Sequence, residues 1–207
     1  MITIKKGNKL FTPLRFILSA LPTRADGVRF PGMKRLQVEE DTAVATDSRR
    51  VHWTTHPAVA ELFTPGEYHV VRNGQTMLQL ERKEFFTENK LVRFPEWRKA
   101  IPRQHSKSFT VSAMDAYRIG YTLYAEAAIN MGYPWLQSLL LLGDQEVEVL
   151  FSPESYFVYI KAVGSKKDVL CNAVIAGIMV DTIEVKTKEQ TDGEDTDTDS
   201  IDGAGGE

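Results

Sequence analysis

The chain is poor in cysteine and in long apolar runs, and each shortage removes a class of protein. One cysteine, Cys171, occurs in 207 residues, so no intrachain disulfide can form and a reducing compartment is expected. The longest apolar runs, such as 139–142, are far too short to span a bilayer. The first residues lack the apolar region of a signal peptide. We therefore expect a soluble cytoplasmic protein with no membrane partner.

Signatures of catalytic and metal chemistry are also scarce. The sequence has no glycine-rich phosphate loop and no nucleophile elbow. His52 and His56 are four residues apart, which suits two metal ligands on a helix, but the surrounding pattern is that of a strand. The acidic run 39–41 with Asp47 fits a turn between strands better than a metal cluster. We predict a protein that is not an enzyme, with no cofactor, no metal site and an inert Cys171 in the core.

Charge is unevenly divided along the chain. From residue 187 on there are eight acids, one base and one large aliphatic residue, Ile201, so this stretch has a net charge of −7. It cannot bury enough apolar surface to offset its ordering entropy, and we predict an acidic disordered tail over 187–207. The remainder is mildly basic, with a net charge of +5 over 82–107. Solvated surface explains such a patch, and so does an anionic partner such as nucleic acid. A smaller basic group comprises Arg24, Arg29, Lys34 and Arg35.

Hydrophobic periodicity predicts two helices. The first, around 9–21, has apolar residues at helical spacing, and Thr12–Pro13 supplies an N-cap followed by proline at the first helical position. The second covers about 112–131. It opens with Ser112 and Asp115, which resemble a capping box with Asp in place of the usual Glu or Gln.

Most other segments alternate apolar and polar residues, or are continuously β-branched and aromatic, which is typical of strands. Asn73-Gly74 between two of them predicts a hairpin with a type I′ turn. The expected strands are 35–41, 42–47, 49–55, 67–73, 76–84, 108–113, 146–152, 155–162 and 169–180.

The order of these elements predicts the fold class. A helix followed by several antiparallel strands occurs twice along the chain. We therefore predict an α+β fold in which two helices pack on antiparallel sheets, built from two βαβββ-like halves. The halves are expected at 1–102 and 103–186, before the acidic tail.

Three short motifs resemble one known family. ATDSRRV, residues 45–51, resembles the ATDGHRL corner of the bacterial DNA polymerase III β-type sliding clamps, with Ser48 at the family's glycine and Arg49 at its histidine. VRFPEWRKAIP, residues 92–102, is similar to the clamp pattern GRFPDYRRVIP. AVIAGIMV, residues 173–180, is similar to the closing strand VVMPMRL. The resemblance implies a DNA-clamp-like fold, in which the two halves together make about one clamp domain.

The resemblance also implies a binding site. In the family the three motifs converge on a groove that takes a short linear peptide from polymerases and other partners. An apolar floor with a rim of Arg49, Arg50 and Lys99 would suit a peptide with aliphatic anchors and an acidic or amide group. Carried over residue by residue, the groove would consist of Thr46, Ser48, Arg49, Arg50, Val51, Pro95, Lys99, Ala100, Val174 and Ala176.

Two functions stay open at this point. The resemblance implies a sliding-clamp-like replication accessory or processivity protein, with polymerase or other clamp-binding peptides as partners and double-stranded DNA contacted without sequence specificity. The alternative is a clamp-fold binding module, of phage or mobile-element origin, that does not encircle DNA and binds proteins only. Whether the chain forms a homo-oligomer or a ring is also open. The residues available for DNA contacts are Lys9, Arg15, Arg24 and Arg118.

Overall fold

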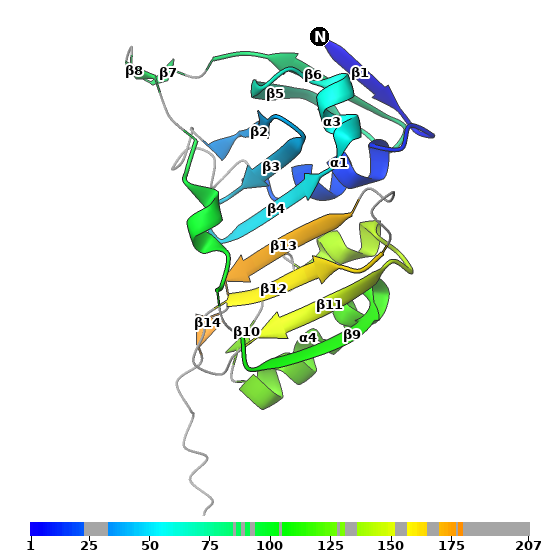
Figure 1. Ribbon diagram of the computed structural model, residues 1–207, viewed down its shortest axis with the longest axis vertical. Helices are drawn as coiled ribbons and strands as arrows, with labels where there is room; N and C mark the ends of the chain where they lie inside the picture. Colours follow the sequence, from blue (N-terminus) through cyan, green and yellow to red (C-terminus); the bar gives the residue numbers. More distant parts are fainter. Residues whose placement is uncertain are drawn as a thin grey trace, which may run out of the picture.

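An antiparallel sheet of ten strands organises the molecule (Figure 1). The computed structural model describes residues 1–22, 33–84, 86–87, 90–91, 94–103, 105–127, 129–130, 136–151, 157–164, 170–176 and 178–179. The ten strands are β1 (Ile2–Lys5), β2 (Arg35–Glu39), β3 (Thr42–Thr46), β4 (Arg50–Thr55), β5 (Gly66–Asn73), β6 (Met77–Arg82), β9 (Lys107–Ser112), β11 (Glu146–Phe151), β12 (Phe157–Ala162) and β13 (Cys171–Ala176). Their order across the sheet is β1-β6-β5-β2-β3-β4-β13-β12-β11-β9. Two short pairs lie outside the sheet, β7 (Phe86–Thr87) with β8 (Lys90–Leu91) and β10 (Ile129–Asn130) with β14 (Ile178–Met179).

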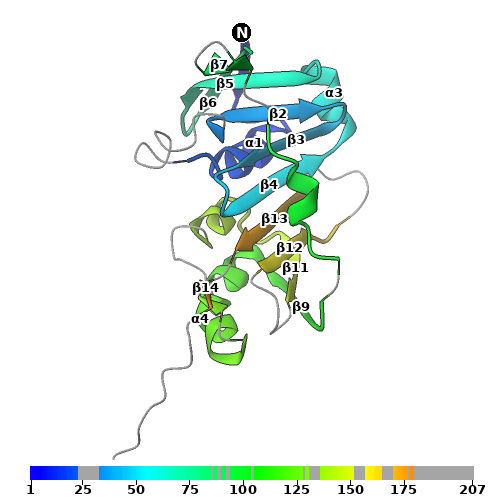
Figure 2. The same ribbon diagram turned by 90° about the vertical axis from the view of Figure 1, so that its left-hand side faces the viewer.

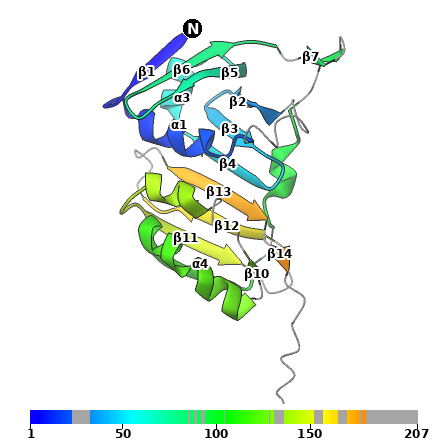
Figure 3. The same ribbon diagram turned by 180° about the vertical axis from the view of Figure 1, so that it is seen from behind.

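Helices lie on both faces of the sheet. The described helices are α1 (Phe11–Leu18), α3 (Pro57–Leu62), α4 (Ala113–Ala127) and the 3₁₀ helices η2 (Trp97–Ala100) and η3 (Gln137–Leu141). Figures 2 and 3 show α1 and α4 on one face, here called the helix face, and η2 on the opposite, outer face. In the described part of the chain, no helix is both long and apolar enough to cross a membrane.

The predicted α+β class is confirmed. The order strand, helix, three long strands is seen twice, first as β1-α1-β2-β3-β4 and then as β9-α4-β11-β12-β13, with short β10 after α4. Strands β4 and β13 pair with each other, so the two parts of the chain share one sheet. The domain boundary near residue 102 stays a prediction. The acidic tail, 187–207, lies outside the described residues.

The start of helix α1 differs from the prediction. The helix begins at Phe11, not after Thr12, and Pro13 is its third residue. The turn before the helix supplies the cap, because the side-chain oxygen of Asn8 accepts from the Leu10 N–H at 2.9 Å and the Asn8 carbonyl accepts from the Phe11 N–H at 2.9 Å. Proline is tolerated at the third position because N–H groups of the first turn have no partner within the helix.

The start of helix α4 follows the prediction. The backbone N–H of Asp115 donates to Ser112 Oγ at 3.0 Å, and that hydroxyl donates to the Asp115 carboxylate at 2.8 Å. The prediction of two helices omits α3, which is too short to show a helical period. Its signal is the pair His56-Pro57: the His56 ring accepts from the Ala58 N–H, and proline occupies the first turn.

The nine predicted strands are all present, with ends shifted by one to three residues. Strand β1 was not predicted because four residues are too few to show alternation. The β5–β6 hairpin is present, but its turn is not type I′. Three residues, 74–76, separate the strands, and neither Asn73 nor Gly74 has the positive φ that a type I′ turn requires. The Gly74 N–H donates to the Met77 carbonyl at 3.0 Å and closes this longer loop.

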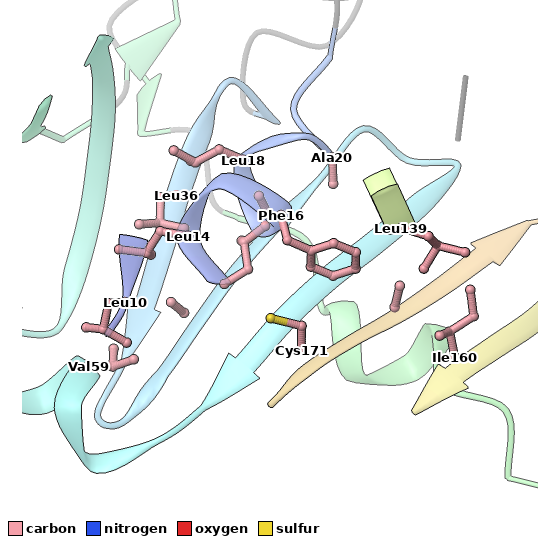
Figure 4. Packing of buried hydrophobic residues seen from close by; sticks show 14 of the residues in the cluster. Leu10, Leu14, Phe16, Leu18, Ala20, Leu36, Val59, Leu139, Ile160 and Cys171 are labelled. Carbon is pink, nitrogen blue, oxygen red and sulfur yellow. The ribbon is translucent and has the colours of Figure 1, made fainter. Parts of the chain in front are cut away.

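The main core fills the helix face (Figure 4). Leu14, Phe16 and Ile17 of α1 are fully buried against the sheet, and Cys171 lies in the same core. Each such aliphatic or aromatic side chain contributes about 1.5–3 kcal/mol through burial. At Gly120 of α4 an added Cβ would lie 2.3 Å from a side-chain carbon of Leu136, so only glycine permits this close approach.

Candidate functional site

A second, smaller apolar cluster lies on the outer face, where three distant parts of the chain meet. The outer cluster consists of the buried residues Val44, Val51, Trp53, Trp97 and Val174. They come from β3, β4, η2 and β13. Further apolar side chains are partly buried against it: Phe94, Ala100, Ile101 and Tyr159. The 45–51 corner, the 94–101 segment and the closing strand β13 therefore contribute to one surface.

Strand alternation decides which side chains reach this surface. Along β4, Val51 and Trp53 join the outer cluster, while His52 stacks on Phe16 of the helix face with ring centroids 4.4 Å apart. Arg50 has the same parity as His52 and points to the helix face. The sequence analysis placed Arg50 on the rim beside Val51, and the sheet pleat separates the two.

The corner before β4 is closed by its own hydrogen bonds. The Thr46 hydroxyl donates to the Arg50 carbonyl at 2.7 Å and accepts from the Ser48 N–H at 3.1 Å. Ser48 has a φ of 76°, in the left-handed region that glycine adopts most easily. The family pattern has glycine at this position, so the corner keeps the backbone form with a less suitable residue.

Asp47 holds the same corner together. One carboxylate oxygen accepts from the backbone N–H groups of Arg49 and Arg50 at 2.9 and 3.0 Å, and the other accepts from Arg50 Nε at 3.0 Å. Both side chains of this ion pair are buried. Arg50 therefore fixes the corner instead of offering a solvent-exposed charge, and Asp47 is not part of a metal cluster.

The 94–101 segment is anchored on the outer face by polar contacts. Glu39 of β2 accepts from the indole N–H of Trp97 at 3.4 Å and from the guanidinium of Arg98. Arg98 also lies over the Trp97 ring, 4.5 Å from its centroid. Lys99 pairs with Glu96 and is 81% exposed. Trp97 is thus inserted into the outer cluster, while the charges of the segment face solvent.

Arg35 differs most from its expected place. Sequence analysis counted it in a basic surface group, but its side chain is fully buried and forms an ion pair with Glu67 at 3.1 Å. Its guanidinium also lies 5.8 Å from the centroid of the Phe94 ring. Burial lowers the pKa of Arg35, and the nearby Glu67 carboxylate partly opposes that shift. Arg35 therefore supports the 94–101 segment from below.

Aromatic residues that the sequence analysis left out complete the site. The Trp53 ring lies 5.3 Å from Trp97 and 5.7 Å from Tyr159, centroid to centroid. Burial raises the pKa of Tyr159, and the nearby Glu148 carboxylate adds to the shift. Strand parity was the missed signal: Trp53 has the same parity as Val51, and Tyr159 is paired directly with Val174.

The remaining predicted groove residues fall into clear groups. Val51 and Val174 are deep in the outer cluster, 7% and 1% exposed, and Ala100 lies at its partly buried margin. Pro95 precedes η2 and is half-buried, while Ser48 and Arg49 are exposed at the corner. Thr46 is buried. The backbone of Ala176 pairs with Phe157, and its side chain lies outside the described part of the chain.

The predicted DNA-contacting residues lie on the other side of the sheet. Lys9 pairs with Glu61 at 3.3 Å and Arg118 pairs with Asp115 at 3.1 Å. Arg15 lies 5.9 Å from the Phe11 ring centroid, and Arg24 falls outside the described residues. Lys9 and Arg15 border a hollow of about 610 Å³ lined by Lys6, Gly7, Asn8, Lys9, Phe11, Thr12, Arg15 and Gln75.

The histidine and cysteine candidates have structural surroundings. His52 Nδ1 lies 2.9 Å from the Phe16 carbonyl. Burial lowers the pKa of His52 to about 3; the bond to Phe16 opposes this shift and the charge of Arg50 adds to it. Burial raises the pKa of Cys171 to about 12, so its thiol stays protonated and unreactive near neutral pH. Among the described residues, no three His, Cys, Asp or Glu side chains are grouped to hold a metal ion.

Comparison with solved structures defines the class of fold. The chain has the fold of the bacterial DNA polymerase sliding clamps. It superimposes on the DNA polymerase III subunit beta of Pseudomonas aeruginosa with a TM-score of 0.51 and 13% identity, covering 87% of this chain and 67% of that one. The Helicobacter pylori beta clamp in complex with carprofen gives 0.52, 12%, 86% and 67%, and the Bacillus subtilis sliding clamp gives 0.51, 13%, 86% and 64%.

The likeness is structural and partial. No protein-family model matches the sequence, and no curated protein matches it. The chain spans about two thirds of the length of these clamps. The comparisons therefore show the fold, and leave activity and partners to be proposed.

Proposed function

We propose that this protein is a clamp-like accessory factor of DNA replication that docks short peptide segments of partner proteins on its outer face. The observation that carries the proposal is the meeting of Val51, Ala100 and Val174 in one apolar cluster, from three segments far apart in the sequence. The clamp-like fold supports it. The proposed role is binding, not catalysis.

The surface suggests how a peptide would be held. Val51 and Val174 lie too deep for direct contact, so aliphatic anchors would pack on the partly buried Ala100, Ile101 and Tyr159. The exposed Lys99 would attract an acidic group from its side of the surface. Such a peptide gains most of its affinity from the buried anchors, because an exposed charge contributes little in water.

A second candidate is the clamp-fold module that binds proteins without encircling DNA. It is favoured by the pairing of Lys9 with Glu61 and of Arg118 with Asp115, which leaves the helix face a weaker attraction for phosphates. Static light scattering separates the two candidates. Encirclement requires assembled chains that bind a DNA duplex, whereas a monomer or dimer without duplex affinity supports the module.

Peptide selection tests the proposed docking. Random heptapeptides displayed on phage would be selected on the full chain, and their dissociation constants measured on Ala100→Trp, which fills the margin of the cluster. We expect at least tenfold weaker binding to that variant and a two- to fivefold loss with Lys99→Glu at low salt.

The matched control is Lys5→Glu, an exposed charge reversal on β1, which should leave binding unchanged. Selected peptides that bind the chain and Ala100→Trp equally well would show that docking occurs elsewhere. Failure to enrich any peptide would end the proposal.

A further inference from the structure

Exposed cations follow the proposed docking surface toward the edge of the sheet. Arg98 and Lys99 are 60% and 81% exposed at the side chain, and Arg103 and Lys107 are exposed further along. Between 94 and 107 the sequence has these four cations and one acid. Arg98 and Lys99 have carboxylate partners at the protein surface, but solvent-exposed pairs of this kind exchange readily with other anions.

The chain leaves the sheet close to these cations. Val174, near the end of β13, packs in the same cluster as Trp97 of η2. After β14 ends at Met179, 28 residues follow. Extended chain spans up to about 3.3 Å per residue, roughly 90 Å in all, so this segment can reach the outer face with ample slack.

The chemistry of that segment matches the partner proposed above. Residues 187–207 carry a net charge of −7, and their single large aliphatic, Ile201, has Asp199 and Asp202 close by in sequence. An acidic stretch with one aliphatic anchor is the kind of peptide that a partly apolar surface with cations at its margin would accept. A tethered peptide also competes at a local concentration near the millimolar range, so weak docking suffices.

We propose that the acidic segment 187–207 docks on the outer face beside Lys99 and Arg103 and competes there with partner peptides. This inference rests on the proposed docking function, because it assigns a regulator to the same surface. A partner would have to displace the segment, so its apparent affinity falls by the fraction of chains in which the segment is docked. Salt weakens the docking and thereby reduces the inhibition.

The test compares the full chain with a full-length variant whose tail charges are removed. In that variant Asp192, Asp195, Asp197, Asp199 and Asp202 become Asn and Glu194 becomes Gln. The probe is a fluorescein-labelled peptide with the sequence of residues 194–202, and fluorescence polarisation gives its affinity. We expect about three- to tenfold tighter binding to the neutralised chain at 50 mM NaCl, with most of the difference lost at 500 mM.

Charge reversals locate the docking. Lys99→Glu and Arg103→Glu in the neutralised chain should weaken the probe severalfold, and Lys5→Glu should not. Equal affinity of the probe for the full and neutralised chains would overturn the inference, and so would binding that ignores both reversals. If selected heptapeptides bind the outer face while this probe does not, the regulator is wrong and the docking function stands. If neither binds, the docking function itself fails.

Discussion

The two faces of the ten-stranded sheet are both covered, but by different means. On the helix face, α1, α4 and η3 bury a continuous apolar core that includes Leu14, Phe16 and Leu139. On the outer face, the cover over the middle strands is the 94–101 segment, held by Trp97 and by Glu39. The contrast shows that one face supplies stability, while the other keeps apolar and charged groups at an accessible margin. That margin is where we place function.

Removing a helix-face aromatic should break the first half of this comparison. Phe16→Ala deletes a fully buried ring that also stacks on His52, and leaves a cavity between α1 and the sheet. We expect the free energy of unfolding to fall by about 3–5 kcal/mol, measured by urea denaturation. Thr12→Ala, at an exposed site on the same helix, is the control and should change little. A loss below about 1 kcal/mol would show that α1 is not a core element.

The outer face should tolerate the equivalent change better. Trp97→Ala removes the residue that anchors the 94–101 segment, but this short cover can shift to solvent and relieve part of the cavity. We expect a loss of about 2–3 kcal/mol, at or below the lower end for Trp→Ala substitutions. Near-ultraviolet circular dichroism from the Trp53–Trp97 contact should weaken while the far-ultraviolet spectrum stays the same. Global unfolding would mean that the outer cluster is as essential as the main core.

Acid should destabilise the helix face through His52. Its pKa is about 3 in the folded protein, below the ordinary value of 6.5, so the unfolded chain binds the proton more readily. The stability is therefore complete above pH 6.5 and is lost as the pH falls toward 3, at about 1.4 kcal/mol per pH unit. Unfolding free energies measured between pH 6.5 and 4.5 should drop by about 2–3 kcal/mol more for the native chain than for His52→Gln. Equal slopes for the two proteins would contradict this assignment.

The smallest effect should come from the corner beside the outer cluster. Ser48→Gly relieves a left-handed backbone, with φ at 76°, and we expect the free energy of unfolding to rise by up to about 1 kcal/mol. Ser48→Val should lower it, because a β-branched residue tolerates this conformation worst. Thermal denaturation of both variants checks the sign. A stabilised valine variant would mean that the corner has a different backbone conformation in solution.

Sequence patterns predict the elements of this fold better than their contacts. Period-two alternation predicts all nine long strands, and the Ser112–Asp115 spacing predicts the start of α4. Chain order does not reveal that β4 pairs with β13, because that pairing joins residues more than 110 positions apart. The same limit applies at the site. The motifs indicate the three segments, but the burial of Arg35 and the turning of Arg50 to the helix face depend on tertiary packing.

Hydrogen exchange of the full chain with a phage-selected peptide tests the difference between the two faces most directly. Mass spectrometry with and without the peptide identifies which amides become protected. We predict added protection in 46–51, 94–101 and 171–176, with Phe11–Leu18 and Ala113–Ala127 unchanged. Protection confined to those two helices would contradict the account, because it would place docking on the face that we assign to stability.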